Sequence, residues 1–426
     1  MNKKDREKVM AEQKVEDVVV IGGGPAGMMA AGRAAELGHS VLLLEKNPTL
    51  GKKLLITGGG RCNVTNNKPV VREMLAKYKG SDKFLFSAFS QFGVKETLEF
   101  FNKKGMATKE ENEGRIFPVS DRAQSVWSVL EKYMKDSGVK VRTDAEVEGI
   151  SLNKNTNNIY IKLKDGAVIT AKSCVLATGG ISNPETGSTG EGFTWLKNLG
   201  HKIVENDLAL VPIKLKDIWV RNLSGIPLTD IKLTVFQKGE KRGVAKGKLL
   251  FTHFGISGPT VLNMSKEIGE YIQYGDVRID LDLFPKLDHG ELKKKLQELL
   301  TEESNKKLKN TLGNLAPAAL GEALLQISNI DGEAFNHSVR SETRAKLVSL
   351  MKAVPLNVSG LMGADKAVVS SGGVALEEVD FKTMQSRVVP GLYLVGDVLN
   401  VDRPSGGYSL QLCWTSGYVA GSNIKI

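Results

Sequence analysis

The chain has 426 residues, which is enough for two or three domains with a sizeable core. Its net charge of +10 favours anionic ligands, but the lysines and arginines are scattered, which is more typical of an enzyme with a phosphate-bearing cofactor than of a nucleic-acid-binding protein. The three cysteines form no CxxC pair, so we expect neither a disulfide framework nor a metal site. No stretch approaches 18 consecutive apolar residues and the charged N-terminus lacks an apolar core, so we expect a cytoplasmic protein without membrane contact.

The strongest motif lies between Asp17 and Lys46, which read DVVVIGGGPAGMMAAGRAAELGHSVLLLEK. A short, apolar and β-branched run predicts a strand that is buried on both faces, and an alanine-rich helix and a second apolar strand follow it. Glycines spaced G-x-G-x-x-G separate the first strand from the helix. This order of strand, glycines, helix and strand predicts a dinucleotide-binding site.

Each glycine of this motif has its own role. Gly22 permits a tight turn, Gly24 lets backbone N–H groups approach a pyrophosphate, and Gly27 allows the helix to pack closely on the strand. The N-terminus of the helix adds partial positive charge for the phosphates. Glu45, at the tip of the second strand, can accept hydrogen bonds from an adenosine ribose.

A glycine-rich loop follows the motif, with the sequence NPTLGKKLLITGGGRCNVTN between Asn47 and Asn66. Three consecutive glycines, Gly58 to Gly60, expose backbone N–H groups, and Lys53 and Arg61 add positive charge. A segment of this kind can lie along a phosphate chain and reach a ring system beyond it. The alternative is an ordinary glycine-rich surface loop, which the position directly after a nucleotide motif makes the weaker interpretation.

These two stretches, VVIGGGPAG with Glu45 and then GKKLLITGGGRCNVTN, resemble the HI0933-like, BaiN-type family of bacterial FAD-dependent oxidoreductases. That family is related to the glutathione-reductase-like flavoproteins. The resemblance implies non-covalent FAD, with the ADP half on the G-x-G-x-x-G motif and the isoalloxazine approached by the GGGRCN loop. It also implies that the backbone of Val147 contacts the adenine and that Ala177, Thr178 and Gly179 pass close to the pyrophosphate or the adenosine.

The middle of the chain has a different character. From about Leu208 the sequence predicts short strands, some with clear alternation, and therefore a β-rich insert that resembles a small barrel. Within it, FTHFGISGP contains a stretch that resembles a family signature, FTHxGxSGP, and brings His253 near the flavin as an acid/base or a hydrogen-bond donor. The alternative is a turn histidine that is bonded to nearby backbone. Three lysine-rich helices, which we expect to be solvated, follow over residues 286–353.

The last motif, GLYLVGDVLNVDRPSGGYSLQLCW, returns to the first domain. A buried strand delivers Gly396 and Asp397, whose carboxylate is suited to accept hydrogen bonds from ribityl or pyrophosphate-side hydroxyls. Gly407, Tyr408 and Gln411 open a final helix whose N-terminal dipole can stabilise negative charge at the flavin. The family pattern is VDGxxGGYN, and this chain departs from it with the Arg403-Pro404 pair and with Ser409.

The expected fold is therefore α/β, with a discontinuous, Rossmann-like and glutathione-reductase-like FAD-binding domain over residues 1–205 and 354–426. The expected insert covers residues 206–353 and is β-barrel-like over 206–285 and helical over 286–353. The expected cofactor contacts are Gly22, Gly24, Pro25, Ala26, Gly27, Glu45, Lys46, Lys53, Gly58, Gly59, Gly60, Arg61, Cys62, Asn63, Val147, Ala177, Thr178, Gly179, Gly396, Asp397, Gly407, Tyr408 and Gln411.

The function implied is that of an FAD-dependent oxidoreductase, linked to NAD(P)H, that passes a hydride through flavin N5 to a small unsaturated, imine-type or carbonyl-type substrate or to oxygen. The catalytic candidates are His253, Arg61 and Tyr408, and Cys62 is a further candidate as a redox thiol. No second G-x-G-x-x-G unit occurs in the sequence, so a nicotinamide nucleotide has to dock on a different surface or be replaced by another donor. The alternatives are a tRNA-modifying flavoprotein and a non-enzymatic, FAD-binding redox sensor, and the oligomeric state stays open.

Overall fold

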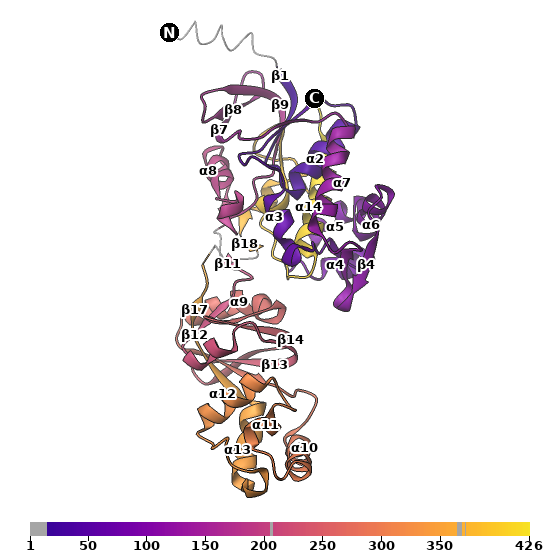
Figure 1. Ribbon diagram of the computed structural model, residues 1–426. Helices are drawn as coiled ribbons and strands as arrows, with labels where there is room; N and C mark the ends of the chain where they lie inside the picture. Colours follow the sequence, from indigo (N-terminus) through magenta and orange to yellow (C-terminus); the bar gives the residue numbers. More distant parts are fainter. Residues whose placement is uncertain (1–14, 205–207, 364–368, 371) are drawn as a thin grey trace. The chain divides into compact units, whose positions relative to one another are not determined.

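The computed structural model describes residues 15–204, 208–363, 369–370 and 372–426, and it divides into two compact units (Figure 1). Unit 1 combines Met1–Leu208 with Val368–Ile426, and unit 2 is Ala209–Ala367. Unit 1 is thus assembled from both ends of the chain, with unit 2 inserted between them. The charged N-terminal segment and the expected boundary at residues 205–206 lie outside the described residues.

Unit 1 is built on a seven-stranded sheet, whose strands are β1 (Val15–Ile21), β2 (Val41–Leu44), β6 (Lys140–Arg142), β7 (Val147–Leu152), β8 (Ile159–Leu163), β9 (Val168–Leu176) and β20 (Leu392–Leu394). The strand order is β6-β2-β1-β9-β8-β7, and β20 also pairs with β9. Strands β6, β2, β1, β9 and β20 are parallel, whereas β7, β8 and β9 form an antiparallel meander. Val18, Val19, Val20 and Ile21 of β1 are buried on both faces, which confirms the prediction for this strand.

The helices of unit 1 are α2 (Pro25–Glu36), α3 (Lys52–Ile56), α4 (Val71–Leu75), α5 (Asp82–Gln91), α6 (Val94–Lys103), α7 (Ala123–Asp136), α8 (Glu191–Asn198) and α14 (Tyr408–Asn423). Helices α2 and α14 lie side by side, although almost the whole chain separates them in sequence (Figure 1). Their backbones approach closely, because a Cβ atom on Gly417 would lie 2.4 Å from the carbonyl oxygen of Ala26. The small residues of both helices therefore fix the C-terminal helix against the first one.

Smaller sheets complete unit 1. A three-stranded sheet has the order β3-β5-β4, with β3 (Thr65–Asn66), β4 (Thr108–Glu111) and β5 (Arg115–Pro118). Two short pairs join the segments that lead to and from unit 2, with β10 (Ile203–Val204) beside β19 (Gly373–Val374) and β11 (Leu208–Ala209) beside β18 (Val369–Ser370). The departing and returning segments of the chain are therefore hydrogen-bonded to each other.

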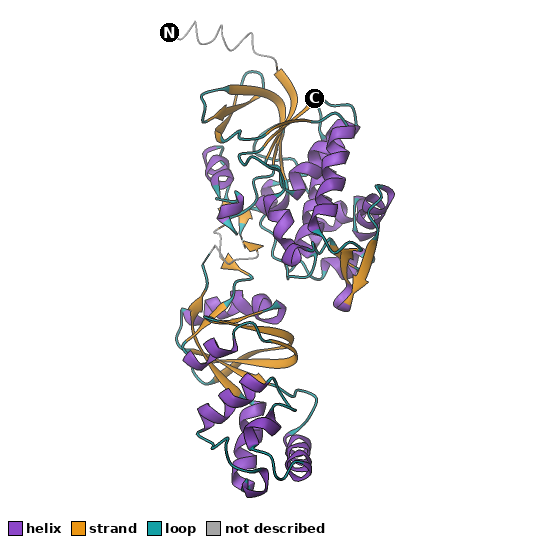
Figure 2. Ribbon diagram, in the orientation of Figure 1, coloured by secondary structure: helices purple, strands orange, loops and turns teal. Residues whose placement is uncertain are grey.

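Unit 2 contains a closed antiparallel barrel, which confirms the prediction of a barrel-like insert (Figure 2). Its strands are β12 (Ile213–Leu215), β13 (Pro227–Gln237), β14 (Glu240–Thr252), β15 (Gly255–Ser257), β16 (Val277–Asp282) and β17 (Val354–Leu361). The order around the barrel is β12-β15-β14-β13-β16-β17, and β17 closes it by pairing with β12. Alternate residues of β13, namely Ile231, Leu233 and Val235, are buried in its core.

The structure corrects the second domain boundary. The sequence analysis returned the chain to the first domain at residue 354, but the strand that begins there, β17, pairs with β12 and β16 of the barrel. The return to unit 1 comes only at Val368. A short apolar strand carries no local mark of the sheet to which it belongs, because both units bury such strands.

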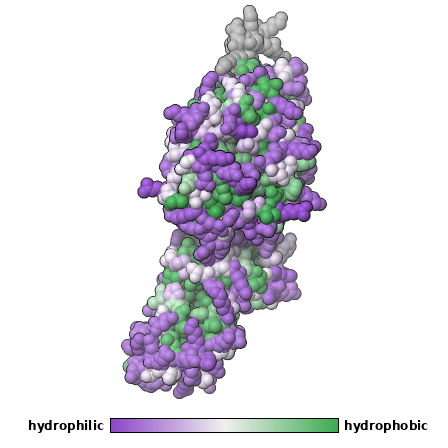
Figure 3. All heavy atoms as spheres, turned by 90° about the vertical axis from the view of Figure 1, so that its right-hand side faces the viewer, coloured by the Kyte–Doolittle hydropathy of each residue, from purple (hydrophilic) through white to green (hydrophobic). Residues whose placement is uncertain are grey.

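The helices of unit 2 are α9 (Pro259–Ile272), α10 (His289–Glu302), α11 (Leu308–Leu312), α12 (Ala318–Ser328) and α13 (Ser341–Lys352). The end of unit 2 that contains α10 to α13 presents mostly hydrophilic side chains on the face drawn in Figure 3. A buried ion pair at the end of α13 joins this helical part to the barrel, since Lys352 Nζ lies 2.8 Å from Asp282 Oδ2. In the described part of the chain, we find no helix with the length and apolarity needed to cross a bilayer.

Candidate cofactor-binding site

A cavity opens at the carboxyl ends of the parallel strands β1, β2, β9 and β20 of unit 1. This edge is where open α/β sheets bind their ligands. Many of the predicted residues lie together in its wall, although they come from five separate stretches of sequence. They are Gly22, Gly24, Pro25, Ala26, Glu45, Lys46, Lys53, Val147, Ala177, Thr178, Gly179, Gly396 and Asp397.

The glycines of the first motif have the three roles that their spacing predicts. Gly22 has φ +107°, and a Cβ atom there would lie 2.5 Å from the carbonyl oxygen of Ala177. A Cβ atom on Gly27 would lie 1.9 Å from the carbonyl oxygen of Gly22, so only glycine allows this approach of helix to strand. A Cβ atom on Gly24 would meet no protein atom within 4 Å, because this position faces the cavity. The first and third glycines shape the protein, and the second leaves room for a ligand.

Glu45 lies at the end of β2 and is 8 % exposed. Its Oε2 accepts a hydrogen bond from the backbone N–H of Gly23 at 2.7 Å, and its Oε1 accepts from the backbone N–H and the side-chain amide of Asn47 at 2.8 and 2.7 Å. These bonds hold the carboxylate in the cavity wall next to the N-terminus of α2. That position is the one expected for an acid that binds a ribose.

Lys53 brings a cation into the same wall. Its ammonium group donates to the carbonyl oxygen of Ser182 at 2.6 Å and to Ser188 Oγ at 2.7 Å. Burial lowers the pKa of Lys53, and the negative charge of Asp397 opposes this shift. A desolvated ammonium group that is held in place is suited to stabilise a negative charge on a ligand.

The cavity has the features that an FAD molecule needs at its phosphate end. Thr178 Oγ1 is buried in the wall and has no hydrogen-bond partner within the described residues, so it is available to a ligand. The N-terminus of the twelve-residue helix α2 begins at the same place, and Gly24 leaves the approach to it open. The residues present therefore fit a dinucleotide with a diphosphate group.

Comparison with known families agrees with this geometry. The sequence model described as "HI0933-like protein Rossmann domain" matches residues 16–423, which is nearly the whole chain. The chain belongs to the HI0933-like family. Family membership confirms the resemblance on which the expected FAD-binding fold rests.

Two relatives are similar over almost their full lengths. The 3-dehydro-bile acid delta(4,6)-reductase of Clostridium scindens is 32% identical over 406 residues, covering 94% of this chain and 97% of that protein. The ribosomal RNA dihydrouridine synthase of Escherichia coli is 31% identical over 408 residues, covering 96% and 98%. This HI0933-like chain is accordingly a flavin-dependent oxidoreductase.

Solved structures show the same fold at low sequence identity. A 3-ketosteroid-Δ4-(5α)-dehydrogenase from Rhodococcus jostii has a TM-score of 0.56 and 14% identity, covering 97% of this chain and 98% of that one. A flavocytochrome c3 fumarate reductase has a TM-score of 0.53 and 18% identity, covering 99% and 80%. At these identities the likeness concerns the fold alone.

The glycine-rich loop of this HI0933-like protein has an unusual backbone. Gly58, Gly59 and Gly60 have φ values of 57°, 67° and 85°, and Cys62 has φ 61° although it carries a side chain. A non-glycine residue in this region is strained, and such strain is common at ligand-binding sites. The turn from Gly58 to Cys62 does not line the cavity, although Lys53 of the same loop does, so the contact of this turn with the isoalloxazine stays a prediction.

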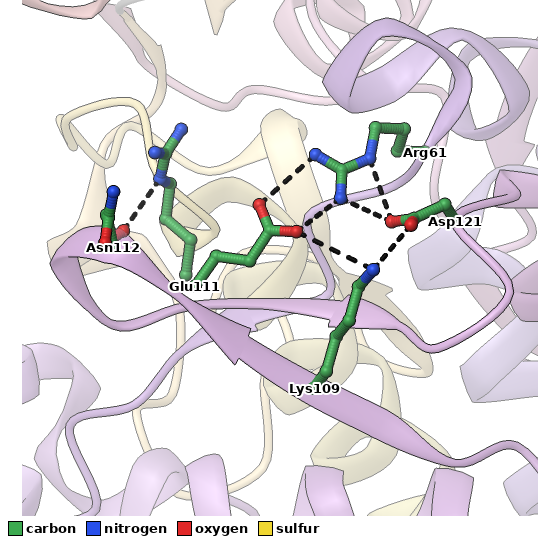
Figure 4. A network of polar contacts seen from close by, with 6 residues as sticks. Arg61, Lys109, Glu111, Asn112 and Asp121 are labelled. Carbon is green, nitrogen blue, oxygen red and sulfur yellow. Dashed lines mark hydrogen bonds and ion pairs between the residues drawn. The ribbon is translucent and has the colours of Figure 1, made fainter.

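Arg61 anchors this loop to the β4–β5 hairpin. Figure 4 shows its guanidinium group between the carboxylates of Glu111 and Asp121, which Lys109 also bridges. The Arg61 side chain also lies over the ring of Phe117, with its guanidinium carbon 4.2 Å from the ring centre. Arg61 holds the pKa of Glu111 below its ordinary value. Lys109, with Arg61, does the same for the pKa of Asp121. These contacts give Arg61 a positioning role for the loop rather than a free catalytic charge.

Cys62 does not have the properties of a redox thiol. Burial raises the pKa of Cys62 to about 12, so its sulfur stays protonated near neutral pH. Its two fellow cysteines are also free and buried. The neighbouring Asn63 has a buried side-chain oxygen without a hydrogen-bond partner within the described residues, which keeps it a candidate for a ligand contact.

Gln411 and Tyr408 begin helix α14 but do not line the cavity. The amide of Gln411 accepts from Thr65 Oγ1 at 2.6 Å and donates to Thr97 and Thr415, so its side chain is used inside the protein. Tyr408 is nearly buried, and its carbonyl oxygen accepts from Tyr78 OH at 2.8 Å. Burial raises the pKa of Tyr408, so its hydroxyl group keeps its proton. The side chain of Gln411 thus supports the start of this helix, and its contact with the cofactor stays a prediction.

His253 lies in unit 2, in the turn between β14 and β15, and is exposed to solvent. Its ring packs edge-on against Phe254, with the ring centres 4.9 Å apart. Its role next to the flavin stays a prediction.

The sequence analysis named Arg403 only as a departure from the family pattern, yet this buried arginine forms an ion pair with Asp397 of the cavity. An arginine three residues before Gly406-Gly407 carried no local signal of such a contact.

Proposed function

We propose that this chain reduces a carbon–carbon double bond that is conjugated to a carbonyl group in a small organic molecule. The observation that supports this most is the chemistry shared by the two near-full-length relatives. A 3-dehydro-bile acid with double bonds at positions 4 and 6 is an unsaturated ketone, and uridine has a double bond next to a ring carbonyl. Both names describe saturation of an activated double bond, on substrates of very different size.

FAD, when bound and reduced, supplies the two electrons for this chemistry. The protein contributes binding and electrostatics. Gly24 and the N-terminus of α2 receive the diphosphate, and Glu45 receives the adjoining ribose. Thr178 offers its unpartnered hydroxyl group to the same part of the ligand.

A conjugated double bond accepts electrons more readily when a donor polarises its carbonyl group, and a proton must then be delivered to the neighbouring carbon. We propose Tyr408 of unit 1 for the first of these tasks. Tyr408 keeps its proton because of burial. Replacing Tyr408 by phenylalanine tests the assignment through the rate of substrate reduction at a constant rate of cofactor reduction.

The proposed electron donor is NAD(P)H. Within the described residues, the strand–G-x-G-x-x-G–helix unit that begins at β1 is the only one of its kind, and FAD occupies it in this proposal. The nicotinamide nucleotide therefore binds without a second such unit. Anaerobic titration with NADH and with NADPH tests the donor, and failure of both to bleach the flavin absorbance would remove this part of the proposal.

A second candidate function is reduction of uridine in RNA. Besides the relatives' names, one observation favours it: the β14 strand of the barrel exposes Lys241, Arg242 and Lys246 on one hairpin. Such a basic ribbon is able to follow a phosphate backbone. The three free and buried cysteines fit a reducing, cytoplasmic location for either function.

The decisive experiment uses the purified holoprotein, reduced anaerobically and mixed with 2-cyclohexen-1-one, a 3-oxo-Δ4 steroid or a uridine-containing RNA transcript. Cyclohexanone is the matched control, because it keeps the carbonyl group and lacks the double bond. We expect the unsaturated ketones to restore the flavin absorbance at 450 nm at least tenfold faster than the control, and the product to gain 2 Da. Reoxidation by RNA alone, with dihydrouridine in the digested transcript, would favour the second candidate, and reoxidation by neither would overturn both.

A further inference from the structure

Arg403 is held rigidly behind the wall of the FAD cavity. Its side chain is 1 % exposed, and each end of its guanidinium group has a partner. Nε donates to Ser409 Oγ at 3.0 Å, Nη1 donates to the carbonyl oxygen of Val401 at 2.7 Å, and Nη2 donates to Asp397 Oδ1. Arg403 and Ser409, two positions at which the sequence departs from the family pattern, are thus joined by a hydrogen bond.

Asp397 lies between this arginine and the cavity. It follows Gly396 at the end of β20, lines the cavity, and has a side chain that is 15 % exposed. Arg403 itself does not line the cavity. Arg403 can therefore act on a ligand in two ways: by fixing the position of Asp397, or through the positive charge of its own guanidinium group.

The charges at this end of the cavity do not cancel. Among the groups shielded from solvent, Asp397 contributes one negative charge, whereas Lys53 in the wall and Arg403 behind it contribute two positive charges. Glu185, whose charge also acts on Lys53, is exposed and screened by water. Cys413 also lines the cavity, and burial raises its pKa to about 12, so its thiol is neutral. Charges interact strongly in such a poorly solvated place, and the cluster carries a net charge of about +1 by this count.

We propose that Arg403 is a positioning residue that orients Asp397 toward FAD and leaves a net positive charge in the cavity wall, which favours the reduced cofactor. The inference rests on FAD as the cofactor of the proposed function. A reduced flavin ring carries more negative charge than an oxidised one, so positive charge near it raises the reduction potential. Removing Arg403 brings the local charge to zero and leaves a carboxylate that is nearly buried and has lost its guanidinium partner.

The test is a charge series measured by the midpoint potential of the bound flavin. The series changes the net charge of the cluster formed by Lys53, Asp397 and residue 403. This net charge is 0 in Arg403→Met, +1 in the wild type and in the double variant Asp397→Asn/Arg403→Met, and +2 in Asp397→Asn. We expect Arg403→Met to lose about tenfold in the preference for reduced over oxidised FAD, which is about 30 mV for a two-electron couple. The double variant returns to the wild-type potential, and Asp397→Asn lies above it.

The affinity for oxidised FAD distinguishes the orienting role of Arg403 from the effect of its charge. We expect Arg403→Lys, which keeps the charge and loses the planar group, to have the wild-type potential and at least tenfold weaker binding of oxidised FAD. Arg387→Met, which removes an exposed arginine paired with Asp380, is the matched control and leaves both quantities unchanged.

The outcomes are distinct. Wild-type protein that stays colourless with FAD overturns the proposed function. Wild-type protein that binds FAD while Arg403→Met keeps the same potential and affinity overturns this inference. If Arg403→Met alone does not fold, the comparison of the double variant with Asp397→Asn still decides, because an Arg403 that is merely a structural support would leave these two variants with the same potential.

Discussion

The two units of this protein form their important contacts in opposite ways. In unit 1 the FAD cavity depends on positions that have no side chain, such as Gly22, Gly24 and Gly27, where backbone approaches backbone or leaves room for a ligand. In unit 2 the barrel and its helices depend on side chains, with a buried apolar core and the ion pair between Asp282 and Lys352. A requirement for glycine appears in the local sequence, whereas a pairing of distant side chains does not.

The strongest test of this comparison is Lys352→Met in unit 2. Asp282 is 2 % exposed, and Lys232 lies farther from it than Lys352 does, at 3.2 Å. Removing one partner of a buried ion pair costs about 3–5 kcal/mol. We expect the free energy of unfolding of unit 2 to fall by that amount, with FAD affinity changed less than twofold, as measured by urea unfolding and FAD titration. A tenfold loss of FAD affinity would contradict the separation of the two units.

The next effect concerns Gly27→Ala in unit 1. The new Cβ atom would meet the carbonyl oxygen of Gly22 at 1.9 Å, so the helix or the strand has to shift. Overpacking of this kind costs about 1–3 kcal/mol. We expect the FAD-free protein to unfold at a lower temperature and to bind FAD poorly.

Gly24→Ala is the matched control for this variant. Its Cβ atom meets no protein atom within 4 Å, so we expect the FAD-free protein to unfold at the wild-type temperature while FAD binding weakens at least tenfold. Equal losses of stability in the two variants would show that the second glycine also shapes the protein.

A smaller effect on stability is expected from the buried thiol of Cys62 in unit 1, and it depends on pH. Unit 1 contains all three cysteines. Burial raises the pKa of Cys62 from 9.0 to about 12. Above pH 9 the unfolded thiol loses its proton while the buried thiol keeps it, so stability is intact below pH 9 and falls as the pH rises toward 12. Between pH 8 and pH 10 we expect the wild type to lose about 1.4 kcal/mol more than Cys62→Ala in urea unfolding. Parallel pH profiles would contradict the burial of this thiol.

The smallest change in stability is expected for Arg61→Gln. The side chain is 36 % exposed, and ion pairs of this kind contribute little to stability because water screens them. Because Arg61 anchors the loop from Gly58 to Gly60, we expect faster proteolysis of this loop with little change in the unfolding temperature. Lys132→Gln, on an exposed pair with Asp136, is the matched control. An unfolding temperature lowered by more than about 5 °C would show that the network of Figure 4 supports more than the loop.

The sequence was sufficient for the cavity because its requirements are local. The strand–glycine–helix order of residues 17–46 predicted β1, α2 and β2. Together with the family resemblance, the sequence predicted half of the residues that line the cavity.

The errors arose where distant residues decide the structure. Ser120 and Asp121 have side chains that are typical of a helix N-cap, but α7 begins at Ala123 and Asp121 instead pairs with Arg61 and Lys109. A chain segment sixty residues away thus prevailed over a capping preference. The long strands β13 and β14 were expected as short ones, and β17 was assigned to the wrong unit, because barrel pairing is a property of the whole unit.

The assembly of unit 1 from both ends of the chain has a consequence for biosynthesis. A ribosome makes β1 and α2 before unit 2 and makes β20 and α14 after it, so the partner of β9 and the covering helix of α2 arrive only once unit 2 has been synthesised. Asp397 and Arg403 also follow unit 2 in the chain. Until then the cavity lacks part of its wall, so complete binding of the flavin has to follow the synthesis of unit 2.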